Sequence, residues 1–443
     1  MRAIVAGALL SLFVSPATSL AQQQQPFNVA VQVTELSRVF TDLYGPTGLI
    51  VNSNTLLASG ATHSAHFNSG FESEFSQFGT ALTSQIVSLP LPPPASGFTY
   101  QFDPALGVFN RTTSSFGPIL SERAETIGSG RVAVGFSHQR LSFDSIEGIG
   151  LAAVPAVFTH DSAELRGGRE DVVTTINNIS ARVTRSAGFV SYGVTNHLDV
   201  SVVLPVVTAD VIVRSDAQVR RIGTTNPETH FFRTSDDGIG DRRTFTAFGE
   251  ASGLGDVTIR FKQNVRRRDQ YGAAVGLDVR LPTGDEHNLL GTGAPGAQPF
   301  AVWSGVYGAV SPHVNLGYQW NGASVLASSP GSGVSADLPD VVAYSAGGVI
   351  AVHPKLTAAV DLIGRYVIDS PRLRRETFRA LDGVTLLPNI AFGRGSFNEV
   401  SAALGLKVNV VGPLLLNANV LMRLNSVGLR DKISPMVSVE YAF

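Results

Sequence analysis

Apolar and polar residues alternate one by one along most of the chain after residue 130. In residues 257–262 every odd position is apolar and every even position is polar. Residues 271–281 and 414–425 repeat the pattern, and the chain ends on it over residues 433–443. A period of two gives each strand one apolar and one polar face. The sequence therefore predicts an all-β protein whose sheet has two chemically different faces.

Twelve segments carry this alternation, and most of them are long enough to cross a bilayer, which takes about 9–11 tilted residues. The pattern leaves the facing of the second and sixth segments ambiguous. The segments are residues 130–143, 174–193, 197–213, 256–266, 270–281, 300–310, 313–322, 340–352, 355–369, 397–410, 413–425 and 433–443.

The connections between these segments alternate strictly between long and short. The long ones are residues 144–173, 214–255, 282–299, 323–339, 370–396 and 426–432. The short ones are residues 194–196, 267–269, 311–312, 353–354 and 411–412. Long loops outside and tight turns in the periplasm are typical of outer-membrane barrels. We therefore expect an antiparallel transmembrane β-barrel of about 12 strands, with 14 as the alternative count, formed by residues 130–443.

A soluble β-sandwich or barrel also alternates, but it turns its apolar face inward and leaves charges free on the other face. Here the polar faces are rich in Gly, Ser, Asn and Thr and carry few charges, as a confined interior requires. The apolar faces also place aromatic residues near both strand ends: Trp320, Tyr344 and Tyr366 on the loop side, Tyr271 and Tyr441 on the turn side. Two such belts fit the two membrane–water interfaces. The pattern favours the membrane protein.

The first residues read as an export signal. Arg2 precedes an apolar run from Ala3 to Val14, and small residues end at Ala21, so residues 1–21 are expected to be a signal peptide. The run is too short for the roughly 20 residues of a helical membrane anchor, and a Gln tract follows it. With no cysteine in the chain, disulfides and Cys-based metal sites are excluded. These features predict a Gram-negative envelope protein located in the outer membrane.

Residues 22–129 do not follow the barrel pattern. A Gln tract, a Ser/Asn/Gly-rich region and a Pro-rich break at residues 90–94 occupy this part of the chain. It is too long for a leader alone. The sequence leaves two interpretations, a periplasmic extension or a segment that folds back into the lumen. Residues 103–129 favour the plug slightly, because they abut the first strand.

Two stretches resemble a known family. The run Ser252-Gly253-Leu254-Gly255-Asp256-Val257-Thr258 looks like a Gly-Leu-Gly-Asp motif of outer-membrane proteins grouped with the phenol meta-degradation pathway barrels. The run from Arg280 to Asp285, followed by residues 288–293, is similar to the exit of that family's fifth strand. Residues 192–200 also fit its turn pattern. The resemblance covers residues 170–443 and implies a barrel with a transport role, with the substrate undetermined.

If the apolar faces meet lipid, twelve charged residues point into the lumen, six of each sign. They are Asp199, Asp256, Arg260, Lys262, Asp278, Arg280, Asp361, Arg365, Glu399, Lys407, Arg423 and Glu440. A balanced interior argues against strong selection for ions of one sign. A three-residue turn at residues 267–269 would set Asp256 opposite Arg280, with Asp278 diagonal to Arg260. These charges either hold the strands in register inside the barrel or line a path for the solute. Both roles remain open from the sequence.

The sequence therefore predicts a porin-like transporter that passes a small solute passively, with hydrophobic or aromatic compounds as candidates. The rival hypothesis is a structural or surface-interaction barrel that works through its loops without transport. Its 33 cations and 35 anions nearly cancel, so the chain lacks the field that nucleic-acid binding usually needs. No catalytic, cofactor or metal set is expected; His138 has no serine fixed beside it by any motif. The expected partners are outer-membrane lipid, the unidentified solute and, through the terminal Phe443, the barrel-assembly machinery.

Overall fold

The computed structural model describes residues 28–45, 48–56, 65–71, 97, 99–103, 108–111, 115–159, 171–328 and 334–443. The expected signal peptide lies outside these ranges. In the part of the chain that is described, no helix is both long enough and apolar enough to span a bilayer.

Within the described residues, twelve antiparallel strands form a closed barrel, because the last strand pairs with the first. The all-β barrel is confirmed, with twelve rather than fourteen strands. The strands are β6 (Val132–Phe143), β10 (Asp171–Gly193), β11 (Leu198–Arg221), β15 (Val257–Arg267), β16 (Tyr271–Leu281), β17 (Gly296–Gly305), β18 (Val310–Asn321), β21 (Val341–His353), β22 (Leu356–Arg379), β23 (Leu386–Val411), β24 (Leu414–Arg423) and β26 (Ile433–Ala442).

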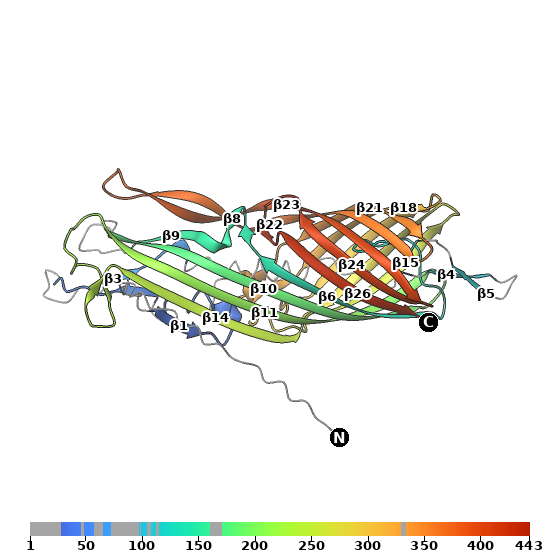
Figure 1. Cartoon of the computed structure of the whole chain (residues 1–443), viewed down its shortest axis with the longest axis horizontal. Helices are drawn as coiled ribbons and strands as arrows, with labels where there is room; N and C mark the ends of the chain where they lie inside the picture. The colour runs from blue at the N-terminus through green and yellow to red at the C-terminus, as the bar shows by residue number, and fades with distance from the viewer. Residues whose placement is uncertain are drawn as a thin grey trace, which may run out of the picture.

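Several predicted boundaries differ from the structure; the turn expected at residues 311–312 lies inside β18, and three further differences affect longer stretches. The sixth strand starts at Gly296 and ends at Gly305, earlier than expected, because the chain turns between Tyr307 and Val310. Residues 370–396, expected to be a loop, are mostly strand. Here β22 and β23 continue as a paired hairpin far beyond the barrel (Figure 1). The connection 214–255 contains a further strand, β14 (Arg242–Leu254), which pairs with the outer part of β11.

The outer surface of the barrel is apolar. Residues at every second position point outward and are one-third to three-fifths exposed, and aromatic side chains such as Trp320, Tyr366 and Tyr441 lie on the same surface. Exposed apolar side chains on so many neighbouring strands would aggregate in water. They fit a hydrocarbon environment, where a closed barrel also satisfies every backbone hydrogen bond.

The sheet of the barrel continues beyond the loop side of the barrel. We call this continuation the loop-side lobe; it consists of residues 171–183 of β10, residues 207–221 of β11, β9 (Val154–Thr159), β14 and β1 (Asn28–Gln32). The strand β1 pairs with β14 in parallel, and all other neighbours in the lobe are antiparallel. In Figure 1 this lobe extends to the left, away from the chain's carboxyl end.

The two faces of β11 exchange character where the strand enters the lobe. In the barrel, Leu204 and Val206 point outward and are half exposed, whereas Asp199 and Ser201 point inward and are buried. In the lobe, the inward positions 207, 209, 211 and 213 are all Val or Ala and are fully buried. The outward positions 208, 210, 214 and 216 are Thr, Asp or Arg, and Ile212 is the one apolar residue between them. The lobe therefore has an apolar core like that of a water-soluble protein.

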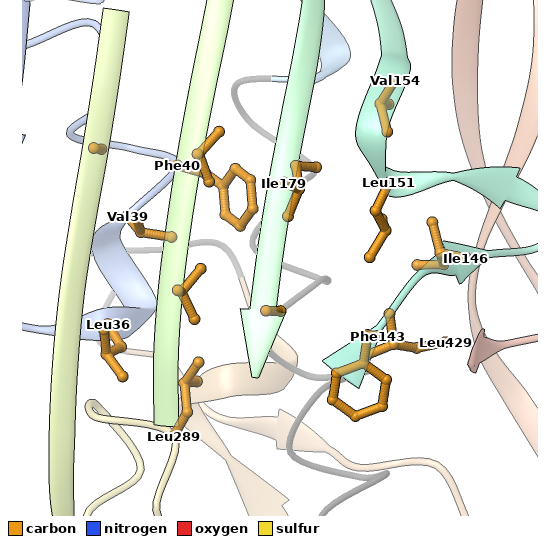
Figure 2. Close-up of a cluster of buried hydrophobic side chains, with 14 of the residues drawn as sticks. Leu36, Val39, Phe40, Phe143, Ile146, Leu151, Val154, Ile179, Leu289 and Leu429 are labelled. Carbon is orange, nitrogen blue, oxygen red and sulfur yellow. The ribbon is translucent and has the colours of Figure 1, made fainter. Parts of the chain in front are cut away.

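Residues near the amino terminus fill this apolar core. Leu36, Val39 and Phe40, on and after the short helix η1 (Leu36–Arg38), pack near Ile179 of β10 and Leu289 (Figure 2). The short strands β2 (Leu49–Val51) and β3 (Ala65–Phe67) form a ribbon whose residues Leu49, Val51 and Phe67 are fully buried in the same cluster.

Candidate functional site

The segment 115–130, here called the inner segment, runs inside the barrel. It has no regular secondary structure, so its backbone N–H groups need partners from elsewhere. Inward side chains of the strands supply them: Phe116 N donates to Thr357 Oγ1 (3.1 Å), and Glu122 N donates to Asn315 Oδ1 (2.8 Å). The N–H of Ile127 donates to the carboxylate of Asp199 at 3.1 Å. The inner segment is thus bonded to several sides of the barrel wall.

Glu122 forms the centre of the strongest ionic cluster. Its carboxylate accepts from Lys262 Nζ at 2.9 Å and from Arg260 at 3.3 Å. The ammonium of Lys262 also donates to the backbone carbonyl of Glu125 (2.8 Å) and lies 3.8 Å from Asp199. The side chains of Lys262, Glu122 and Asp199 are at most 8% exposed, so water screens these charges little. Loss of one partner would leave a buried charge uncompensated.

The pairing of β15 with β16 differs from the predicted register. Arg260 lies directly opposite Asp278, and two bonds of 2.7 Å join them; Asp256 is the diagonal neighbour, with its carboxylate 3.7 Å from Arg280. The expectation that Asp256 faces Arg280 is wrong for two reasons. The hairpin closes at residues 268–271 instead of 267–269, and an extra residue, Val265, bulges between the strands.

Asp256 organises the loop that follows β16. Its carboxylate accepts from the N–H of Gly284 (3.1 Å), the N–H of Thr292 (2.8 Å) and the hydroxyl of Thr292 (2.6 Å). A Cβ at Gly291 would lie 2.3 Å from the Asp256 carboxylate, so this close approach requires glycine. The two sequence runs that carry the family resemblance therefore meet at one point of the wall, where β14 passes into β15.

A second ionic cluster lies near the loop-side end of the lumen. Arg365 donates to Glu399 at 2.8 Å, and Arg430 lies 3.5 Å from the same carboxylate. Arg423 bonds to Asp144 and, at 2.5 Å, to Ser145. Arg365, Glu399, Arg423 and Arg430 border a small cavity of about 40 Å³, together with Ser401, Asp431 and Ser434. Its apolar lining consists of Leu141, Phe143, Ile363, Leu421 and Leu429.

The remaining inward charges lie toward the turn side. Asp361 accepts from His313 Nε2 at 2.5 Å and lies 3.4 Å from the backbone N–H of Leu120. Lys407 donates to the carbonyl of Phe116 at 3.2 Å. The carboxylate of Glu440 accepts from the N–H of Gly97 at 3.1 Å. Each charge therefore bonds to an inner part of the chain or to another strand.

Ten of the twelve predicted residues are buried, and Arg260 and Arg423 are half-buried. The structure brings them into pairs and triads rather than into one ring. Sequence reasoning missed Glu122, Arg430 and His313, which complete these groups. Glu122 could have been found, because residues 122–125 form a charged run directly before the first strand. Arg430 could not have been found in this way, because it lies in the predicted connection 426–432, and only the folded structure shows where this connection runs.

One pair on the outer surface resembles a catalytic arrangement only in part. His138 Nδ1 lies 3.0 Å from Ser186 Oγ, across β6 and β10. In the described chain, no acid or amide side chain bonds to the other ring nitrogen, so the base lacks the group that would orient it. Nor do the described residues include a cluster of three or more His, Asp or Glu that could hold a metal ion.

Comparison with known proteins supports the family resemblance. The model of a family described as "Putative MetA-pathway of phenol degradation" matches residues 166–335, which contain both sequence runs discussed above. No curated protein sequence matches the chain. The closed barrel, its apolar outer surface and this match place the chain in the bacterial outer membrane.

Several solved structures align with most of the chain at low identity. An outer membrane channel from Pseudomonas putida F1 covers 72% of this chain and 98% of its own, with 12% identity and a TM-score of 0.41. The Ralstonia pickettii toluene transporter TbuX covers 81% and 100%, with 12% identity and a TM-score of 0.34. A Pseudomonas aeruginosa FadL homologue covers 79% and 96%, with 9% identity and a TM-score of 0.31.

Proposed function

We propose that this barrel carries a small hydrophobic or aromatic solute passively across the outer membrane. The observation that carries the proposal is the cavity beside Arg365 and Glu399, because its wall combines five apolar side chains with a closed ionic cluster. Seven polar or charged residues line the same cavity, so the five apolar side chains would contact the apolar part of a small ligand while the polar groups orient it. The three arginines at this cavity are balanced by the carboxylates of Glu399, Asp144 and Asp431, so no excess of one sign would select an ion.

The inner segment determines how a solute could leave this cavity. The inner segment crosses the lumen on the turn side of the cavity. It is bonded there to Asp199, Lys262, Thr357 and Asn315. A solute of aromatic size exceeds the 40 Å³ now free, so lining side chains must move to admit it. Passage then requires either that the inner segment shifts or that the solute leaves sideways through the wall.

Binding by the purified barrel tests this role. Leu421 and Leu416 lie on the same strand, β24, but Leu421 lines the cavity and Leu416 points outward. Leu421→Gln should weaken binding of radiolabelled toluene about tenfold, since removal of one apolar contact of this size costs about 1.4 kcal/mol. Leu416→Gln should leave toluene binding unchanged. Equal binding by both variants and the unaltered protein would contradict the proposal.

Planar-bilayer recording separates transport from a purely structural or surface role. Discrete conductance events from the refolded barrel, or from a variant whose inner segment is loosened, support a path through the lumen. Silence from both, together with unchanged toluene binding in Leu421→Gln, would favour the surface-interaction hypothesis. In that case the hairpin of β22 and β23, which projects beyond the barrel, would be the first region to examine.

The last strand is also proposed to be the part read by the barrel-assembly machinery. Phe443 ends the chain with an exposed ring, 4.7 Å from the ring of Tyr441. Deletion of Phe443 should lower the amount of folded barrel in the outer membrane, whereas Tyr307→Ala, an exposed aromatic change in a turn, should not. Heat-modifiable migration of membrane fractions on gels measures this difference.

A further inference from the structure

The amino-terminal residues pack on the loop side of the barrel. The strand β1 adds to the edge of β14 over five residue pairs, from Asn28 opposite Thr244 to Gln32 opposite Phe248. The N–H of Val33 continues this contact by donating to the carbonyl of Phe248 at 2.9 Å. Because β14 belongs to the long connection 214–255, this contact lies beyond the membrane-spanning part of the barrel.

Three further backbone contacts reach three different long connections. Ser37 N donates to the carbonyl of His287 (2.8 Å), in the connection after β16. Asn52 and Phe231 exchange two bonds of 2.8 and 2.9 Å, and Asn68 and Thr159 exchange two of 2.7 and 2.9 Å. Every partner lies on the loop side, although the three connections are far apart in sequence.

Burial shows that these residues are part of the loop-side lobe rather than attached to its surface. Leu43, Leu49 and Phe67 are completely buried. The ring of Tyr44 packs edge-on against Phe158 and Phe245, at 5.3 and 5.1 Å, and its hydroxyl bonds to Ser215 at 2.9 Å. Without the amino-terminal residues, the apolar inward faces of β10 and β11 in the lobe would meet water.

The next described residues along the chain lie on the opposite side. Gly97 bonds to Glu440 on the last strand, close to its carboxyl end, and Thr126 donates to the carbonyl of Asn196 in a short turn at 2.7 Å. Phe71 and Gly97 thus belong to opposite ends of the barrel.

We propose that the barrel holds its own amino-terminal segment, residues 28–71, on the outer surface of the cell. Long loops of outer-membrane barrels face the outside, and all contacts of the segment named above are with those loops. The segment completes the apolar core of the loop-side lobe, so the lobe is a surface structure built from the amino-terminal segment together with β9, β10, β11 and β14. This assignment is independent of which solute the barrel carries.

The absence of cysteine from the chain makes the location directly measurable. Single variants Asn54→Cys, Asp382→Cys and Lys355→Cys place a thiol at exposed positions in the amino-terminal segment, the outer hairpin and a short turn. In intact cells, a membrane-impermeant maleimide should label Asn54→Cys and Asp382→Cys equally, and Lys355→Cys only after the outer membrane is opened. Labelling of Asn54→Cys that requires opening, as for Lys355→Cys, would overturn the proposal.

A cross-link tests the contact without relying on accessibility. Asn68 and Thr159 form a hydrogen-bonded antiparallel pair, whose Cα separation of about 5.5 Å suits a disulfide. The double variant Asn68→Cys, Thr159→Cys should form an internal disulfide in cells, seen as a reduction-sensitive shift on gels, and neither single variant should. A folded double variant with free thiols would contradict the assigned position of the segment.

Discussion

Strands β10 and β11 run through two parts of the molecule that bury opposite kinds of side chains. In the barrel, Val190, Tyr192, Leu204 and Val206 are among their outward residues, and Asp199, Ser191 and Ser201 lie buried on the inside. In the loop-side lobe, their outward residues are mainly polar, and Val173, Ile179 and Val211 are among the buried ones. The backbone pairing continues unchanged through the transition. The difference therefore comes from the surrounding solvent, hydrocarbon in one part and water in the other.

The contrast extends to what fills each part. The barrel interior contains the inner segment, held by hydrogen bonds and by the cluster at Glu122, Lys262 and Arg260. The lobe interior contains side chains from Val33 to Phe71 among the residues that the structure describes, held by apolar contacts. A polar lining needs a specific partner for every charge, whereas an apolar core needs only close packing. Substitutions should therefore act differently in the two parts.

The largest effect is expected from a charge placed in the lobe core. Val211→Asp puts a carboxylate at a fully buried apolar position and should destabilise the fold by about 4 kcal/mol, because a buried charge lacks compensation there. Ile212→Asp, one residue further and outward, should change stability by less than about 0.5 kcal/mol. Urea titration followed by gel migration measures both. Equal loss in the two variants would mean that the lobe faces are not distinct.

Removal of the central carboxylate of the barrel interior should come next. Glu122→Gln leaves Lys262 with Asp199 as a distant partner and should cost about 3 kcal/mol. The loosened inner segment should also raise single-channel conductance in planar bilayers. Glu376→Gln changes an exposed carboxylate of the outer hairpin and serves as the control. An unaltered unfolding curve and conductance in Glu122→Gln would show that the inner segment does not depend on this cluster.

A smaller difference should appear between two outward positions of β11. Leu204→Arg places a cation on the apolar outer surface and should cost about 2 kcal/mol, since lipid-facing cations become costly with depth. Ile212→Arg lies in the water-facing part and should cost less than about 0.5 kcal/mol. Refolding into lipid vesicles gives both values. If Ile212→Arg proved the more damaging change, the boundary between barrel and lobe would be misplaced.

The smallest effect concerns pH and the lobe alone. Burial would raise the pKa of Asp171, but bonds from His230 and from the N–H groups of Ile222 and Gly223 outweigh it and hold the pKa below its ordinary 3.8. The resulting stabilisation is fully present above pH 3.8 and is lost as pH falls through the lower folded pKa.

Limited proteolysis of the lobe between pH 6 and pH 2 measures this effect. In Asp171→Asn the stability of the lobe should no longer fall in this way as pH is lowered. Asp382→Asn, in an exposed turn, should lose lobe stability at low pH as the unaltered protein does. An identical acid profile for the unaltered protein and Asp171→Asn would remove Asp171 from the explanation.

The sequence predicts the barrel well because period-two alternation is clear in most of its strands. It left the second strand ambiguous for a reason that the structure explains: along β10, Val190 and Tyr192 face outward in the barrel, whereas Val173 and Ile179 face inward in the lobe. One apolar face cannot describe a strand whose environment reverses. The change of solvent, not weak alternation, produced the ambiguity.

The candidate site was predicted residue by residue but not as a geometry. Inward facing follows from alternation, whereas pairing depends on register, which the bulge at Val265 and the position of the hairpin turn shift. Contacts such as Glu122 with Lys262 join residues far apart in sequence, and no local pattern encodes them. The pairing of β1 with β14 likewise joins segments far apart in sequence and could not be predicted from a local pattern.

The reversal of faces along β11 can be measured directly. Single cysteines at the outward positions 200, 202, 204, 206, 208, 210, 212, 214 and 216 can each carry a spin label in the lipid-reconstituted protein. Collisions with oxygen, which concentrates in hydrocarbon, should dominate through position 206, and collisions with a water-soluble nickel chelate should dominate from position 208 onward. A profile without this step, or one in which water reaches positions 200–206 as freely as 208–216, would contradict the account.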